Sequence, residues 1–272
     1  MSTEHELDEA ERAEDLRAAL NRALRELARA KDRNEDLIAA VYRAVSDAVI
    51  ADPPRPVERP PKDGRKRGDE VALWHLTDWQ GAKTTESYNS GVMRSRVRLF
   101  MDKAERITAI QRADHPVNDC VILFGGDMVE GLFQFPTQPF EVDASIFGQF
   151  VAVSGLLAET VRRALGFYRR VTVVGEWGNH GRIGSRRDAV PRSDNLDRMC
   201  YHTARTMLGD QPRLSWEDSA EDIQRVEVGA YRALSMHSDE VGRTGWVSES
   251  TFLSYIHKLK AGGYGWDFQD VY

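Results

Sequence analysis

The spacing of apolar residues divides the chain into a helical arm, a linker and an α/β region. Over residues 7–50 apolar side chains recur every three or four positions, which predicts one long helix with a narrow apolar stripe. The stripe consists of Leu16, Leu20, Leu24, Leu27, Leu37, Ile38, Val41 and Val45. A long helix with so narrow a stripe usually needs a partner. We therefore expect residues 1–50 to form a coiled-coil-like arm, which either pairs with another copy of the chain or docks on a specific partner protein.

Residues 51–69 have the composition of a linker. The segment holds five of the chain's 10 prolines, and prolines keep a chain extended and exclude helix. Arg65, Lys66 and Arg67 make the linker basic. This charge either contacts nucleic acid or is simply solvated.

From residue 70 onward, short apolar runs alternate with amphipathic stretches. Strands are predicted at residues 71–76, 121–124 and 171–174, a hairpin at 225–228 and 231–236, and helices at 92–113, 145–168, 194–208 and 248–260. Such alternation is typical of the α/β class. We expect residues 70–272 to form one α/β domain.

Composition indicates the class of protein to which this domain belongs and where in the cell it is expected. The chain of 272 residues is 41% hydrophobic and 29% charged, which is ordinary for a globular protein. No apolar run reaches the length of a membrane span, and the acidic N-terminus does not resemble a signal peptide. Cys120 and Cys200 are far apart and are expected to be buried, reduced thiols. These features predict a cytoplasmic protein without membrane contact. The net charge of −6 argues against nonspecific coating of nucleic acid, but it leaves room for a local basic groove.

Polar side chains follow four of the predicted strands directly. Asp78 and Asp127 follow the first two strands, Asn179 and His180 follow the third, and His237 follows the hairpin. Each of these alone would be read as a turn, a helix cap or a buried histidine. In layered α/β folds, however, ligands bind beyond the carboxyl ends of the strands. Polar side chains at the ends of four strands therefore predict one shared site.

The donor types of this site suit a pair of divalent cations. Carboxylate, amide and imidazole groups together fit Mn²⁺, Fe or Zn²⁺ and differ from a thiolate site. One carboxylate can bridge two cations about 3.5–4 Å apart, which is the arrangement used for displacement at phosphorus. The sequence thus predicts a dinuclear metal centre.

Four motifs resemble those of the calcineurin-like metallophosphoesterases. Residues 73–81 (LWHLTDWQG) are similar to the first motif of this superfamily, particularly in its SbcD-like nuclease branch. Residues 124–127 (FGGD), 178–180 (GNH) and 236–239 (MHSD) resemble its G-D, G-N-H-[DE] and H-G-D motifs. With its long N-terminal helix, the chain also resembles metallophosphoesterases encoded by actinobacterial phages. The resemblance implies a layered αββα sandwich, with two sheets face to face and helices outside.

The resemblance also implies a role for each residue. Asp78 would bind one metal, Asp127 would bridge both, and Asn179 and His237 would bind the second. His180 would protonate the leaving oxygen or stabilise the charge that develops at phosphorus. The cofactors would be two divalent ions, with Mn²⁺ expected first and Mg²⁺, Fe or Zn²⁺ as alternatives.

Three departures from the family pattern bear on the metal site. Gln80 stands where the family has a histidine, and it would be a weaker, neutral ligand of the first metal. Gly181 stands where the family has an acid. The final G-H-x-H motif is missing, and residues 267–272 resemble the strand that leads into it. We therefore expect the sequence to be a truncated portion of a longer protein.

The surroundings of the site favour a nucleic-acid substrate. Arg182, Arg186 and Arg187 follow His180 and are expected to bind phosphate oxygens. Phe133, Phe135 and Phe140 follow Asp127 and either stack on bases or pack beneath a loop.

Three functions fit these observations. The first is a metal-dependent nuclease that hydrolyses phosphodiester bonds of nucleic acid. The second is a phosphatase or a nucleotide phosphodiesterase. The third is a non-catalytic binding scaffold with a degraded metal site, which Gln80, Gly181 and the missing motif favour.

Overall fold

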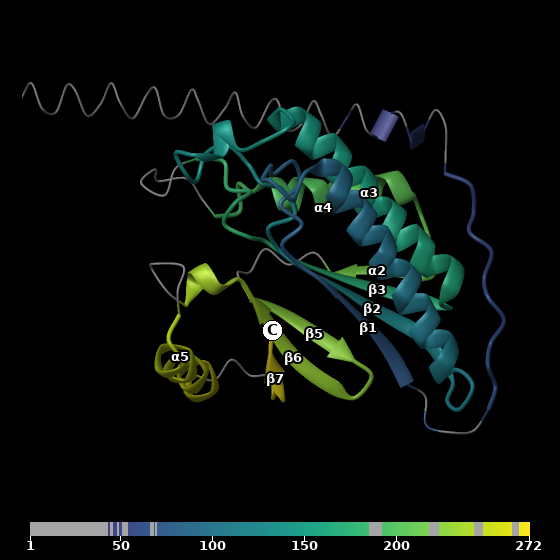
Figure 1. The fold of residues 1–272 in the computed structure, drawn as a ribbon. Coiled ribbons are helices and arrows are strands. Elements are labelled where there is room, and N and C mark those ends of the chain that lie inside the picture. Colours follow the sequence, from purple (N-terminus) through teal and green to yellow (C-terminus); the bar gives the residue numbers. More distant parts are fainter. Residues whose placement is uncertain are drawn as a thin grey trace, which may run out of the picture. The chain divides into compact units, whose positions relative to one another are not determined.

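The chain separates into two compact units, residues 1–53 and residues 54–272. The computed structural model in Figure 1 describes residues 54–65, 68, 70–184, 192–217, 223–241, 247–262 and 267–272, and five positions before them. Those five are Arg43, Ser46, Asp47, Val49 and Ile50, and they are helical. The rest of the predicted helical arm lies outside the described residues.

The larger unit is built on a parallel sheet with the strand order β1-β2-β3-β4. These strands are β1 (Glu70–Leu76), β2 (Val117–Gly125), β3 (Arg170–Glu176) and β4 (Leu214–Glu217). Leu76 pairs with Phe124, and Phe124 pairs with Gly175. The carboxyl ends of β1, β2 and β3 are therefore level, so the loops that follow them begin along the same edge of the sheet.

A second sheet has the order β5-β6-β7. Strands β5 (Ile223–Val228) and β6 (Tyr231–Met236) form the predicted antiparallel hairpin, and β7 (Asp270–Val271) runs parallel to β6. The turn of the hairpin uses Gly229 at φ 63°, a left-handed conformation that glycine adopts without steric cost. Buried side chains join the two sheets: they are Val121, Leu123 and Val174 from the first sheet, and Val226 and Ala233 from the second.

Helices complete the layers (Figure 1). α2 (Ser90–Gln111), α3 (Ile146–Phe167) and α4 (Leu196–Leu208) cover the face of the first sheet that is turned away from the second. α5 (Glu249–Ala261) packs Leu259 against Leu234 and Met236 of the second sheet. The predicted mixed α/β class is confirmed. None of the described helices combines the length and the apolar character that crossing a membrane requires.

Local sequence explains most of these boundaries. α3 buries the apolar stripe of Leu156, Leu157, Val161 and Leu165, and Ser145 caps its first turn by accepting a hydrogen bond from the N–H of Gly148. Asn89 caps α2 in the same way. Both cysteines, Cys120 and Cys200, are buried and free.

Residues 54–65 of the predicted linker pack on the rest of the larger unit as an extended strap. Arg162 donates to the carbonyl oxygen of Arg55 at 2.7 Å, and Arg213 donates to that of Val57 at 2.9 Å. Asn118 and Asp63 exchange two hydrogen bonds of 3.1 and 3.2 Å. The backbone of the strap is thus bound by side chains of the domain and is not merely solvated.

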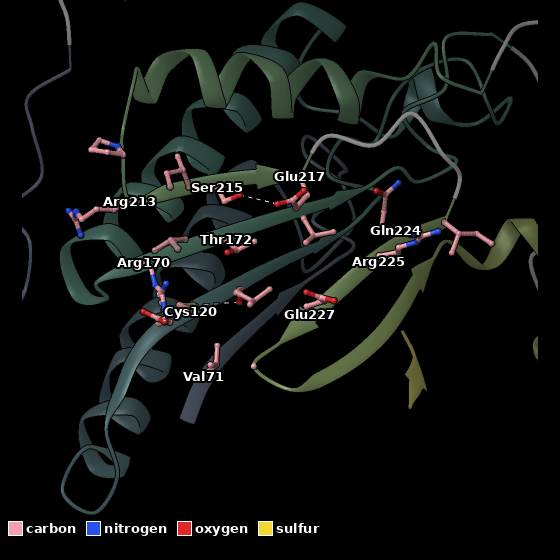
Figure 2. A pocket seen from close by; sticks show the side chains of 18 residues that line it. Val71, Cys120, Arg170, Thr172, Arg213, Ser215, Glu217, Gln224, Arg225 and Glu227 are labelled. Atoms are coloured by element: carbon pink, nitrogen blue, oxygen red, sulfur yellow. Dashed lines mark hydrogen bonds and ion pairs between the residues drawn. The ribbon is translucent and has the colours of Figure 1, made fainter. Parts of the chain in front are cut away.

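A cavity of about 1080 Å³ lies between the two sheets (Figure 2). Thr172 and Ser215 line it from the first sheet, and Gln224 and Glu227 line it from β5. Among the described residues that line it, none belongs to the predicted metal site. The cavity is therefore separate from the strand-end loops that carry the predicted chemistry.

Candidate metal centre

Asp127 lies where three of the strand-end loops meet. It follows β2 and is 3% exposed. Its Oδ1 accepts a hydrogen bond from the backbone N–H of His180 at 2.9 Å, and its Oδ2 lies 3.2 Å from Nε2 of His237. The loops after β2, β3 and β6 therefore converge on one buried carboxylate.

The loop after β1 joins the same group through its backbone. The N–H of Asp78 donates to the carbonyl oxygen of Gly126 at 3.1 Å, and the N–H of Gln80 donates to that of Asp127 at 2.8 Å. The exposed carboxylate of Asp78 accepts a hydrogen bond from the Thr77 hydroxyl at 2.7 Å. The amide of Gln80 is half-buried. All four predicted strand ends thus meet, although Asp78 is turned toward Thr77.

Backbone strain is concentrated in these loops. Among the described residues, the non-glycine residues with positive φ are Asp78 (54°), Gln80 (41°), Ala82 (78°) and Asp127 (53°). A non-glycine residue in this region costs on the order of 1–3 kcal/mol and persists only where its surroundings enforce it. Three of the four are predicted metal ligands, so the strained backbone coincides with the site that the sequence motifs predict.

Glu130 orients His180, and sequence reasoning missed it. Glu130 is buried, and its Oε2 lies 3.1 Å from Nδ1 of His180. Its Oε1 forms an ion pair with Nζ of Lys83 at 3.2 Å. With Nδ1 held by Glu130, the opposite ring nitrogen, Nε2, faces Asp127 at 3.9 Å. The signal in the sequence was an acid three residues after Asp127 in the same loop.

Two effects on His180 oppose each other. Burial alone would lower the pKa of its imidazole, but the hydrogen bond that the ring donates to Glu130 and the charge of Asp127 outweigh burial, so the pKa is raised. A raised pKa favours the protonated ring, which is the form that can donate a proton.

His237 is held between two carboxylates. Its Nδ1 lies 3.0 Å from Oδ1 of Asp239, and its Nε2 faces Asp127. Burial alone would lower the pKa of His237, but these hydrogen bonds reverse the shift and raise the pKa to about 10. The two carboxylates therefore favour the protonated ring, and a metal ion bound at Nε2 would have to displace that proton.

The predicted phosphate-binding arginines have different outcomes. Arg182 forms an ion pair with Asp239, and Arg192 contacts the other carboxylate oxygen at 3.2 Å. Asp239 thus links the loop after β3 to His237. Arg186 and Arg187 lie outside the described residues, so their assignment to substrate stays a prediction.

Gly178 permits the close approach of the loops after β2 and β3. A Cβ atom at Gly178 would lie 1.8 Å from Oδ1 and 2.2 Å from N of Asp127. Gly126, at φ 86°, faces the backbone of Gly178 from the other side. Only glycine fits between these backbones, because any side chain would displace Asp127.

Asp197 binds the backbone of the loops after β2 and β3, and sequence reasoning missed it as well. Its Oδ1 accepts from the N–H groups of Met128 and Val129 at 3.1 and 3.2 Å, and its Oδ2 accepts from Gly178 at 3.0 Å. Burial and the nearby charge of Asp127 raise the pKa of Asp197 to about 7, despite these N–H donors. Because its partners are backbone groups, no side-chain motif reveals it.

The donor set fits a divalent cation by chemical type. Asp78 and Asp127 offer carboxylates, Gln80 and the half-buried Asn179 offer amide oxygens, and His237 offers an imidazole. The buried, negative Asp127 is a site that a cation would stabilise. As the side chains stand, however, His237 contacts Asp127 directly. Within the described part of the chain, no three His, Cys, Asp or Glu side chains are arranged to hold a metal ion. The 3.2 Å between Nε2 of His237 and Oδ2 of Asp127 is compatible with two ligands that share one cation.

Comparison with known proteins adds no family assignment. Neither the known protein families nor the curated proteins contain a match to this sequence.

Proposed function

We propose that the chain is a metal-dependent phosphoesterase of the calcineurin-like superfamily, and that it hydrolyses phosphodiester bonds of nucleic acid. The observation that carries the proposal is the convergence on Asp127, whose carboxylate contacts the loops after β3 and β6. The layered arrangement of two sheets between helices agrees with the αββα sandwich that the sequence motifs imply. The nuclease assignment rests on the likeness of residues 73–81 to the SbcD-like motif.

In this proposal, five residues hold the cations. The ligands are Asp78, Gln80, Asp127, Asn179 and His237. Two divalent ions, Mn²⁺ in the first instance, would supply an activated water and neutralise charge on the phosphate. The surrounding chain contributes the geometry: Gly178 and Asp197 hold the loops together, and Asp239 orients the imidazole of His237.

His180 serves as the proton donor to the leaving oxygen. Glu130 contacts Nδ1 of His180, so the opposite nitrogen, Nε2, faces Asp127. A phosphate would bind on this side of the ring. A positioned acid of this kind contributes about 10²–10⁴-fold to a rate. Arginines that follow His180 would bind nonbridging phosphate oxygens.

Cleavage of DNA by the 272-residue chain tests the proposal. With Mn²⁺ present, the wild-type protein should cleave single- or double-stranded DNA, and His180→Ala should lower the rate at least about 100-fold. His257→Ala is the matched control, because His257 is exposed on α5, and it should keep the wild-type rate. Absence of cleavage of any nucleic acid by the Mn²⁺-loaded protein would refute the nuclease assignment. Turnover of nitrophenyl phosphate or cyclic nucleotides alone would indicate the phosphatase alternative.

A non-catalytic scaffold is the second candidate. Two observations favour it: Gln80 and Gly181 stand where the family has a histidine and an acid, and within the described residues no three His, Cys, Asp or Glu side chains are grouped as metal ligands. Elemental analysis after incubation with Mn²⁺ separates the two. Fewer than one ion per chain, together with no activity, would support the scaffold.

A further inference from the structure

The ring of Phe135 stands beside the proposed acid. The centroids of the Phe135 and His180 rings are 5.1 Å apart, and the ring planes are inclined by 58°. Phe135 is 37% exposed, and Phe133, two residues earlier in the same loop, is 44% exposed. A partly exposed aromatic ring therefore borders the imidazole of His180.

Buried polar groups fix the position of Phe135. The Oε1 atom of Gln138 accepts hydrogen bonds from the N–H groups of Gln134 and Phe135, at 2.9 and 3.1 Å. The Nε2 atom of Gln138 donates to the carbonyl oxygen of Glu130 at 2.5 Å. Because Gln138 is 1% exposed, these bonds are shielded from water. The backbone of Phe135 and the backbone of Glu130, the partner of His180, are thus bound to the same buried amide.

The partly exposed face of Phe135 is suited to stacking with a planar ligand. Exposing a phenylalanine ring to water is unfavourable, and the backbone that carries Phe135 is held by Gln138. A nucleobase is planar and carries its own π-face, and its stacking on an aromatic side chain contributes about 1–3 kcal/mol per base. A nucleotide carries its base next to its phosphate, so a phosphate bound at His180 would bring a base close to the neighbouring ring of Phe135.

We propose that Phe135 stacks on the nucleobase of the nucleotide next to His180, so that the site selects base-bearing phosphate esters over base-free ones. This inference rests on the proposed function only for the placement of the phosphate. The same ring would select nucleotides even in a protein that binds and does not cleave them.

Binding of a nucleotide and of its base-free counterpart tests the inference without catalysis. The probes are thymidine 5′-monophosphate and 2-deoxyribose 5-phosphate, titrated calorimetrically into the full chain with Mn²⁺. The wild-type protein should bind the nucleotide about 5- to 150-fold more tightly, which corresponds to about 1–3 kcal/mol. Phe135→Leu keeps the apolar bulk but removes the aromatic face, so it should lose most of this preference. Phe135→Trp should retain it.

A control addresses the general effect of exposed phenylalanines. Phe147 is 64% exposed in the first turn of α3, outside the loop that carries Phe135. Phe147→Leu should leave both affinities unchanged. Circular dichroism of each variant confirms that it is folded.

The outcomes separate this inference from the proposed function. Equal weakening of both ligands by Phe135→Leu would overturn the inference, since the ring would then act only on His180 or on the loop. An unchanged preference would also overturn it and would indicate that the exposed ring belongs to a protein interface. A preference that depends on Phe135, in a protein that cleaves no phosphate ester, would uphold the inference and refute the catalytic proposal.

Discussion

At the scale of single residues, the site depends on groups that hold the proposed ligands and do not themselves bind metal. Glu130 holds one nitrogen of His180, and Asp239 holds one nitrogen of His237. A partner on one ring nitrogen sets the tautomer and the orientation of an imidazole that acts as an acid or a ligand through the other. Each proposed functional histidine therefore comes with its own carboxylate.

Glu130→Gln tests the orientation of His180. Glutamine has nearly the same shape, but it removes the negative charge and offers a single acceptor oxygen to the two donors, His180 and Lys83. We expect kcat for DNA cleavage to fall about 10- to 100-fold, with little change in KM. Steady-state rates measured with Glu86→Gln, an exposed turn residue, provide the control. A wild-type kcat in Glu130→Gln would show that His180 needs no partner.

At the scale of elements, the strand-end loops are fitted to one another with almost no free space. Gly178 lies against Asp127, and Asp197 binds the backbone of both loops. Such close contact explains why Asp127 can be held in a strained backbone conformation at φ 53°. The loops behave as one unit, and a change in one of them should displace the others.

Gly178→Ala tests this close fit. A Cβ atom 1.8 Å from Asp127 Oδ1 must push the carboxylate away, so we expect the free energy of unfolding to fall by about 1–3 kcal/mol. Gly155→Ala is the opposite case, because a Cβ there meets no atom within 4 Å and Gly155 lies inside α3. Helix propensity predicts a gain of about 0.5–1 kcal/mol for it. Urea denaturation measures both, and a loss at Gly178 no larger than at Gly155 would contradict the model of tightly fitted loops.

The sequence predicted those elements whose signal is local. β1, α3 and the β5–β6 hairpin carry apolar periodicities that identify them, and each appears close to its expected range. β4 was missed because Leu214–Glu217 is a four-residue strand that alternates half-buried and exposed positions. Its pairing with β3 depends on the tertiary fold, and no short apolar run in the sequence indicates it.

The candidate site was predictable in the same partial way. Strand ends and motifs located Asp127, His180 and His237, because their positions depend on the chain immediately before them. Glu130 and Asp197 were missed, because their importance comes from contacts with other loops. The turning of the Asp78 side chain toward Thr77 is likewise a local hydrogen bond that no motif encodes.

At the scale of the whole molecule, the domain of residues 54–272 includes its strap. Arg162 on α3, Arg169 just before β3 and Arg213 just before β4 donate to carbonyl oxygens of residues 55–60. The strap therefore supports the face away from the strand-end loops, and its stability contribution is separable from the site. The role of residues 7–50 in self-association or partner binding stays a prediction.

Arg213→Ala tests the strap. The Arg213 guanidinium donates to Leu165 O and Tyr168 O as well as to Val57 O, at 2.9–3.1 Å. Its loss leaves several carbonyl groups without these donors, so we expect the free energy of unfolding to fall by about 1–3 kcal/mol, while metal affinity stays unchanged. Arg205→Ala, at an exposed position of α4, should have almost no effect. Equal stability of the two variants in urea would show that the strap contributes nothing.

Metal binding through His237 is the most direct test of the central claim. Mn²⁺ is titrated calorimetrically into metal-stripped wild-type protein, into His237→Ala and into His257→Ala, whose histidine is exposed on α5. We expect the wild type and His257→Ala to bind Mn²⁺ with equal affinity. His237→Ala should bind it at least about 100-fold more weakly, because the loss of a direct ligand exceeds the 10- to 100-fold effect of an outer-shell partner. Wild-type affinity in His237→Ala, or no Mn²⁺ binding by the wild type, would contradict the account.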